Sequence, residues 1–261
     1  MAWPLHGCFS TSGLRNAYVN YHWNWHIFLD PAPSGTGTYF DMLLSGLVLT
    51  IETSLLAWVI ALLFGTIVGV MRTLPSRAAS AIGFCYVEFF RNMPLLVQLF
   101  LWFFVLPELL PRGIGLWMKQ LQNAPFYTAA IGIGLFMSAR VAEQLRAGIG
   151  AMPRGQKMAA TALGLTTAQA YIYILLPIAF RIILPPLTSE FLNTIKNTAV
   201  AITIGLIELT GEARAMQEFS FQVFEAFTAA TLMYLAINVV VVVAMRLLER
   251  SVAVPGTIAG K

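Results

Sequence analysis

Five long apolar segments, separated by short polar stretches, run along this chain of 261 residues. The segments cover about 42–70, 81–106, 124–142, 172–204 and 227–245. A helix of roughly 17–25 mostly apolar residues crosses the hydrocarbon core of a bilayer, so each segment is long enough to span it. The pattern predicts an all-α membrane protein with five transmembrane helices.

Prolines and one polar motif interrupt two of these segments. The polar motif 88–94 lies inside the second segment, and Pro177, Pro185 and Pro186 lie inside the fourth. Because proline lacks a backbone N–H and clashes with the preceding helical turn, we expect the fourth segment to break at these positions. That segment is also too long for one span, and its first part, with Arg181, is expected at the membrane interface.

The composition supports a lipid environment. The chain is 58% hydrophobic and 11% charged, whereas about a quarter of the residues in an ordinary soluble domain are charged. So few charges cannot cover a water-exposed surface, and the mean hydropathy of +0.74 agrees. The net charge of +4 comes without a basic run or a basic–aromatic pattern, which excludes nucleic acid as a partner.

The pattern divides the chain into three parts. An extracytoplasmic segment covers 1–40, the transmembrane domain covers 41–250, and a cytoplasmic tail covers 251–261. The chain does not begin with a basic stretch followed by an apolar one, so no cleavable signal peptide is expected.

The first part of the chain contains a histidine pair that invites a metal interpretation. His22 and His26 are spaced i, i+4, but no further ligand lies near them, so no metal site is expected. Trp23 and Trp25 between them favour a position at the membrane surface, where tryptophan is enriched. No catalytic constellation is present either, because all three histidines lie in the first 40 residues.

The distribution of basic residues predicts the orientation. Cytoplasmic loops carry an excess of arginine and lysine, and five spans place the two termini on opposite sides of the membrane. An external N-terminus gives the larger excess inside. The inner residues are then Arg72, Arg77, Arg140, Arg146, Arg154, Lys157, Arg181, Arg246, Arg250 and Lys261, against Arg15, Arg112, Lys119 and Arg214 outside.

This orientation places the polar stretch 143–171 in the cytoplasm, where two short helices are expected. Pro153 fits the start of the first helix, and Gly164 fits a left-handed stop. Thr166 or Thr167 is positioned to cap the second helix, which runs toward Pro177.

The first of these helices has a face of small residues. Ala159, Ala160, Leu163 and Gly164 share that face by their i, i+3 and i+4 spacing, with Arg154 and Lys157 beside it. Small residues allow another backbone to approach closely, so we interpret the helix as a docking element for a protein partner. An amphipathic helix lying on the membrane is the alternative.

The same stretch resembles a known motif. Its fixed positions are Met158, Ala159, Ala160, Gly164, Ile174, Leu176 and Pro177. Their spacing is similar to that of the EAA loop of ABC-importer permeases, EAA-x3-G-x9-I-x-LP, and only Met158 departs, since the family has glutamate there. Gly155 in the run 153–156 and Arg91 in the motif 88–98 also resemble the polar amino-acid (His/Glu/Gln) branch. The resemblance is strongest to its glutamate/aspartate permeases, through the runs 23–25, 107–111 and 153–156.

The resemblance implies the fold and the partners. It implies a type I importer transmembrane domain in a bacterial inner membrane, with the N-terminus periplasmic, working by alternating access. Two ATP-binding subunits would dock on the loop, with Gly155, Met158, Ala159, Ala160, Gly164 and Pro177 as coupling residues. A periplasmic amino-acid-binding protein would deliver the substrate, and a homologous permease or a second copy would complete the path. No cofactor is expected in this chain, because ATP would be hydrolysed by the partner subunits.

Charged residues within the spans are candidates for the substrate path, because a buried charge costs at least roughly 2.5–3.5 kcal/mol. For an acidic amino acid, Arg91 and Lys196 would attract the carboxylates, and Glu52 or Glu190 would meet the ammonium group. Glu88 is spaced i, i+3 from Arg91, so a pair on one helix is the alternative for those two residues.

Two expectations concern packing. Gly65 and Gly69 form a small-x-x-x-small pair that would let the first span approach a neighbouring helix closely. Glu143 and Arg146 are expected to pair on a helix surface.

Two other classes of membrane protein are less compatible with this sequence. An ion-coupled secondary transporter would have more spans and no reason for an ATPase-docking loop. A membrane enzyme would need a catalytic constellation, and none is found. The interpretation that remains is a permease, not an enzyme, for polar amino acids such as glutamate and aspartate.

Overall fold

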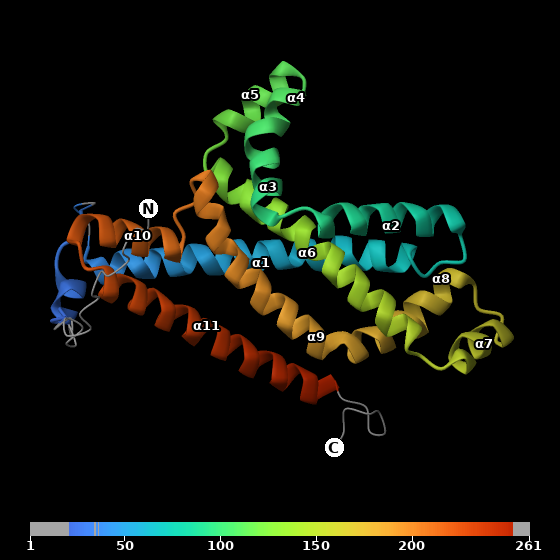
Figure 1. Ribbon diagram of the computed structural model, residues 1–261. Coiled ribbons are helices and arrows are strands. Elements are labelled where there is room, and N and C mark those ends of the chain that lie inside the picture. Colours follow the sequence, from blue (N-terminus) through green and yellow to red (C-terminus); the bar gives the residue numbers. More distant parts are fainter. Residues whose placement is uncertain (1–20, 34, 36, 253–261) are drawn as a thin grey trace, which may run out of the picture.

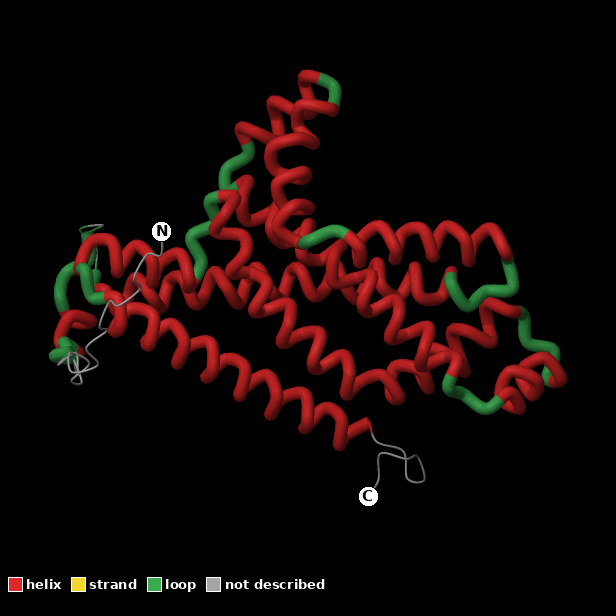
Figure 2. The backbone as a smooth tube through the Cα atoms, in the orientation of Figure 1, coloured by secondary structure: helices red, strands yellow, loops and turns green. Residues whose placement is uncertain are grey.

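The structure is a computed structural model that describes residues 21–33, 35 and 37–252, and this part of the chain is helical, without a β-strand (Figures 1 and 2). The remaining residues, including most of the expected extracytoplasmic segment and tail, lie outside the described part. The elements are η2 (Trp25–Leu29), α1 (Tyr39–Met71), α2 (Arg77–Asn92), α3 (Leu95–Phe100), η3 (Leu101–Val105), α4 (Leu106–Leu109), α5 (Arg112–Gln120), α6 (Ala124–Gly150), α7 (Arg154–Ala162), α8 (Thr167–Ala170), η4 (Tyr171–Leu175), α9 (Leu176–Asn197), η5 (Thr198–Ile204), α10 (Leu209–Ser220) and α11 (Val223–Val252).

Among the described residues, four helical stretches are long and apolar enough to cross a bilayer. They are Tyr39–Met71, Ala124–Gly150, Thr167–Ile204 and Val223–Val252. A fifth is obtained if α2 and the stretch Leu95–Leu109, which meet at a bend of 103°, are counted as one span. The all-α prediction is confirmed, and the predicted five spans correspond to these four helices and the bent pair.

Helix α1 begins at a capping box and is the longest element. The Thr38 side chain accepts the Asp41 N–H, and the Asp41 carboxylate accepts the Thr38 N–H over 2.8 Å. These two bonds satisfy donors that a helix start leaves free. The helix then runs for 33 residues, about 50 Å, which exceeds the hydrocarbon core and requires tilt.

Glycines bring α1 and α6 into close contact. A Cβ on Gly65 would lie 2.6 Å from the Val141 side chain, and one on Gly69 would lie 3.0 Å from Leu145. From the other side, a Cβ on Gly134 of α6 would lie 2.7 Å from Ile60. The predicted small-residue packing of the first span is therefore confirmed, and α6 is its partner.

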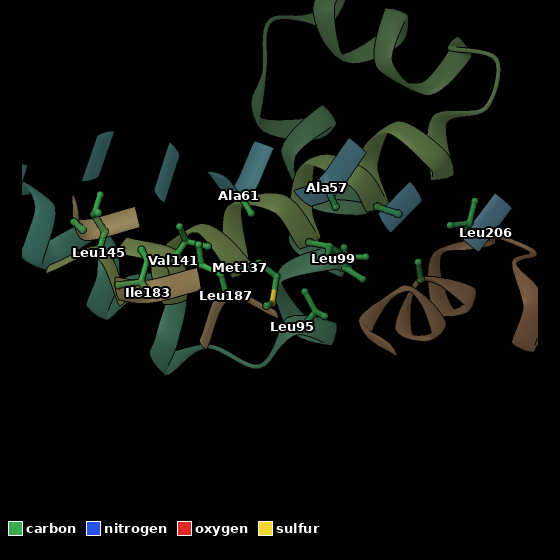
Figure 3. Close-up of a cluster of buried hydrophobic side chains, with 14 of the residues drawn as sticks. Ala57, Ala61, Leu95, Leu99, Met137, Val141, Leu145, Ile183, Leu187 and Leu206 are labelled. Atoms are coloured by element: carbon green, nitrogen blue, oxygen red, sulfur yellow. The ribbon is translucent and has the colours of Figure 1, made fainter. Parts of the chain in front are cut away.

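The largest buried cluster extends from this contact. Figure 3 shows Ala57 and Ala61 of α1 facing side chains from α6 and α9, among them Met137 and Ile183. Met137 is fully buried and Ile183 is 2% exposed. The centre of the fold is thus the α1–α6–α9 layer, over which α2 also lies in Figure 1.

The bend between α2 and α3 follows from Pro94, and a buried glutamine compensates for it. Proline cannot continue the backbone hydrogen bonds of α2, which ends at Asn92. The Gln98 side chain, 1% exposed, donates to the carbonyl of Phe90 over 2.9 Å and to that of Met93 over 3.0 Å. Beyond this bend, α3, α4 and α5 project from the body of the fold (Figure 1).

The expected break at Pro177 is wrong, because a wider helical turn accommodates the proline. The five residues Tyr171–Leu175 form a π-helix, and the Leu176 N–H bonds to the Tyr171 carbonyl, five residues back. The turn contains one extra residue, and this wider spacing accommodates a proline that has no N–H to donate. The same arrangement precedes Pro107, where the Leu106 N–H bonds to the Leu101 carbonyl.

The expected break at Pro185 and Pro186 is also wrong. Helix α9 continues through both prolines from Leu176 to Asn197. Each proline removes one backbone bond, but Ile183 and Leu187 on either side are buried in the core and hold the direction of the helix. The fourth apolar segment is therefore one continuous helical stretch.

A buried carboxylate joins three elements at the opposite end of α1 from Met71. Glu208 is fully buried and caps α10, accepting the N–H groups of Thr210 and Gly211 over 3.0 and 3.2 Å. Its second oxygen accepts the hydroxyls of Tyr234 in α11, over 2.5 Å, and of Thr50 in α1, over 3.3 Å. Four donors compensate for the loss of hydration of this charge.

Candidate functional site

The predicted polar loop contains the expected helices, but it is shorter than the stretch 143–171. Helix α6 continues to Gly150, and α7 begins directly after Pro153. Gly164 has a φ of +73°, as expected for the residue that ends α7. The Leu165 N–H bonds to the Ala160 carbonyl, and the Gly164 N–H bonds to the Thr161 carbonyl. This pair of bonds is a Schellman motif, which requires a left-handed residue at Gly164.

The structure divides the small-residue face expected on α7. Ala160 is 1% exposed, and α7 contacts α8 and η4. Ala159 and Leu163 are exposed, together with Met158 at 65% and Ala162. The surface that α7 offers to a partner is thus the apolar stripe Met158, Ala159, Ala162 and Leu163, which we call the α7 stripe. Ala160 belongs instead to the contact that holds α7 in place.

The other predicted coupling residues lie outside this stripe. Gly155 is exposed, and a Cβ there would meet no atom within 4 Å. Pro177 is exposed and lies at the start of α9, outside α7. The side chains of Arg154 and Lys157 lie outside the described part of the chain.

A second capping box starts the helix that follows. The Thr166 side chain accepts the Gln169 N–H, and the Gln169 side chain accepts the Thr166 N–H over 2.9 Å. Of the two threonines considered as caps, Thr166 therefore has this role. The segment then buries Tyr171 and Leu175 against the core, at 4% and 3% exposure, so the helical segment that follows α7 packs directly on the spans.

Three charged side chains form a network at the end of α1. The predicted pair is present: Arg146 donates from Nε and Nη2 to Glu143 Oε2 over 3.1 and 3.0 Å. Arg72, which sequence reasoning did not connect with this pair, forms a salt bridge to the other oxygen of Glu143. Its guanidinium also lies 5.4 Å from the ring centroid of Phe84, so the network spans α1, α2 and α6.

The charges proposed for the substrate path are not gathered in one place. Glu190 is 9% exposed and faces Arg140 of α6 across 3.8 Å. Glu52, Arg91 and Lys196 are exposed, and none of them makes an ion pair with another described residue.

Glu88 does not form the i, i+3 pair with Arg91 that the spacing allowed. Its carboxylate accepts a hydrogen bond from Asn92 over 2.9 Å, rather than pairing with Arg91. Within the described residues there is no group of three or more metal-ligating side chains.

Three residues whose side chains join separate elements were not identified from the sequence. Arg140, Gln98 and Tyr171 all make their contacts across elements that are distant in the sequence or separated by a bend. Gln98 had the clearest signal, because a glutamine inside an apolar segment needs a partner. For Arg140 the only signal was its position near the end of an apolar segment.

Comparison with known proteins places this geometry in context. Residues 61–254 match the family described as binding-protein-dependent transport system inner membrane component. The glutamate/aspartate import permease protein GltJ of Escherichia coli (strain K12) is 50% identical over 242 residues, which cover 92% of this chain and 98% of GltJ. The probable glutamine ABC transporter permease protein GlnM of Bacillus subtilis (strain 168) is 31% identical over 211 residues, 81% of this chain and 93% of GlnM.

Solved structures agree with the fold. A chain in the crystal structure of an amino acid ABC transporter with histidines is 31% identical and superposes with a TM-score of 0.68, over 82% of this chain and 95% of that one. A chain of the inward-facing MetNI methionine ABC transporter reaches a TM-score of 0.67, over 82% of this chain and 97% of that one. At 18% identity it supports the fold alone.

Proposed function

The chain belongs to the binding-protein-dependent transport system inner membrane component family, and we propose that it forms the membrane path through which an ATP-driven importer carries glutamate and aspartate. It is a permease subunit of an ABC importer for polar amino acids. The observation that carries the substrate proposal is the 50% identity to a glutamate/aspartate import permease over 92% of the chain.

The α7 stripe is the proposed docking surface for an ATP-binding subunit. Four exposed apolar side chains in a loop outside the spans need a cover in water, and a protein groove provides one. The sequence contains no Gly-x-x-x-x-Gly-Lys-Ser/Thr phosphate loop, so in this proposal two partner subunits bind and hydrolyse ATP. Met158 supplies apolar contact where the family has a carboxylate.

Movement of that partner is proposed to drive alternating access. Because Ala160 and Tyr171 are buried, α7 and the start of the fourth span would move as one body. The translocation path is completed by a homologous permease or by a second copy of this chain. A periplasmic amino-acid-binding protein delivers the substrate at the end of the fold that holds α10.

The orientation follows from the positive-inside rule. Arg72, Arg77 and Arg146 gather at one end of α1, α2 and α6, on the same side as α7. This end is assigned to the cytoplasm of a bacterial inner membrane, and the N-terminus to the periplasm.

Uptake by the reconstituted complex tests the proposal. The chain is co-expressed with its ATP-binding and substrate-binding partners, and uptake of labelled glutamate, aspartate, glutamine and lysine is measured with and without ATP. We expect ATP-dependent uptake of glutamate and aspartate, with weak competition by lysine. ATP-independent uptake, or a preference for lysine, would contradict the proposal.

A further inference from the structure

A basic cavity lies between the ends of α1, α2 and α6 nearest α7. Its volume is about 640 Å³. Its polar lining comes from Arg72 at the end of α1, Ser76 in the turn, Arg77 and Ser80 at the start of α2, and Arg146 of α6. None of the proposed coupling or substrate-path residues lines it. Arginine and hydroxyl donors converging on one space are the chemistry that binds a phosphate.

The positive charge of this cavity is only partly compensated. The carboxylate of Glu143 pairs with two of the lining residues, Arg72 and Arg146. Arg77 makes no ion pair with any described residue. Three guanidinium groups against one carboxylate leave two positive charges facing the cavity.

Nearby charges on α2 do not change this balance. Glu88 and Arg91 both act electrostatically on Arg72, and they cancel each other in the count of charges. Burial first, and then the charge of Arg146, lower the pKa of the Arg72 guanidinium. An anion in the cavity would relieve the second of these effects.

The surroundings of the cavity indicate where such an anion comes from. Its wall continues into the apolar side chain of Phe84, which is 51% exposed, and Ile82 on the same helix is 62% exposed. The cavity also lies where the first span ends and the second begins, which is the level of lipid headgroups in a spanning protein. A soluble anion would make no use of the apolar wall, whereas a phospholipid would cover it with an acyl chain.

We propose that this cavity binds an anionic phospholipid, with the headgroup phosphate on Arg77 and Arg146 and an acyl chain along Phe84. The inference takes only the membrane placement of the chain from the proposed function. The transported substrate plays no part in it. Basic pockets between spans at the cytoplasmic side are suited to such headgroups.

Lipid retention measured by native mass spectrometry tests this assignment. The intact complex is purified in detergent, and phosphatidylglycerol or phosphatidylcholine with the same acyl chains is titrated in. We expect selective retention of phosphatidylglycerol. The double variant Arg77→Gln/Arg146→Gln should bind it about thirtyfold more weakly, since two arginines act together. Arg72 is left unchanged because its salt bridge to Glu143 joins the end of α1 to α6, whereas Arg146 pairs with Glu143 within α6.

The matched control removes the same charge elsewhere. Arg246→Gln/Arg250→Gln changes two exposed arginines of α11 that line no part of this cavity, and we expect near-normal retention. Equal losses in the two double variants, or equal retention of the two lipids, would overturn the proposal. Displacement of the lipid by glycerol 3-phosphate alone would assign the cavity to a soluble phosphate compound and overturn the lipid assignment. Because transport is not the readout, these outcomes are independent of the substrate.

Discussion

The Tyr171 hydroxyl donates a hydrogen bond to Thr73 Oγ1 over 3.1 Å. Tyr171 opens the π-helical turn after α8, and Thr73 lies in the turn between α1 and α2. Thr73 in turn donates to the Val70 carbonyl, in the last turn of α1, over 2.9 Å. This chain of two bonds joins the element that carries α7 to the first span, 98 positions away in the sequence.

We expect Tyr171→Phe to weaken coupling without preventing assembly. The ring remains to fill its buried place, and only the bond to Thr73 is lost. A net contribution of about 0.5–1.5 kcal/mol for such a bond corresponds to roughly a two- to tenfold fall in uptake per ATP hydrolysed. The ratio of uptake to ATP hydrolysis in proteoliposomes measures this effect.

Tyr173→Phe provides the control for that experiment. Tyr173 lies two positions further on, but its side chain is 70% exposed. Its substitution should leave the ratio unchanged. Equal behaviour of the two variants would show that the hydroxyl of Tyr171 has no role in coupling.

A second prediction separates two neighbouring alanines of α7. Ala159→Arg places a charge in the middle of the α7 stripe, and we expect loss of the ATP-binding subunit and of uptake while membrane insertion is normal. Met158→Glu, at the edge of the same stripe, restores the family residue and should be tolerated. Co-purification of the ATP-binding subunit distinguishes the two variants.

Ala160→Arg should also abolish transport, but for another reason. Ala160 is 1% exposed, so arginine there forces α7 away from α8 and η4. Faster proteolysis of the loop in the isolated membrane subunit should reveal this for Ala160→Arg and not for Ala159→Arg. An active Ala159→Arg transporter would refute docking on the α7 stripe.

Much of this fold follows from one-dimensional patterns. Apolar run lengths gave the spans, and the glycine spacing gave the close approach of α1 to a neighbouring helix, which the structure identifies as α6. Gly164 gave the end of α7, because a left-handed stop depends only on local backbone geometry. Each of these features depends on residues that are neighbours along the chain, so it can be predicted from the sequence.

The errors lie where distant packing decides. The fourth span continues through Pro185 and Pro186 because Ile183 and Leu187 are buried against α1 and α6, and no local rule contains that contact. Ala160 and Ala159 are equivalent in sequence, and only the position of α8 distinguishes them. The partners of Arg72 and Glu190 likewise lie on other helices.

Gly65→Ala tests the α1–α6 contact. The added Cβ would lie 2.6 Å from Val141 and 2.9 Å from the Ser138 carbonyl, so a helix must shift. Overpacking of this kind costs about 1–3 kcal/mol, and we expect a lower midpoint of thermal unfolding in detergent. Gly113→Ala in α5, where a Cβ meets no atom within 4 Å, should leave the midpoint unchanged or raise it. Matching midpoints for the two variants would contradict the packing.

Lys196→Ala tests the substrate path. Lys196 is exposed in the last turn of α9, within a stretch that spans the membrane, and makes no ion pair with a described residue. A cation kept there without a protein partner is available to an anionic substrate. Loss of a bond to a charged group should lower glutamate uptake about tenfold or more, while the complex stays assembled and hydrolyses ATP.

Lys119→Ala is the control for this last prediction, because Lys119 of α5 pairs with Glu108 and is expected to lie outside the path. Uptake by that variant should remain near normal, since an exposed pair contributes little to stability. Full uptake by Lys196→Ala, with an unchanged KM for glutamate, would remove Lys196 from the path. The charge that balances the substrate would then have to come from Arg91 or from Arg140, whose guanidinium is half-exposed beside Glu190.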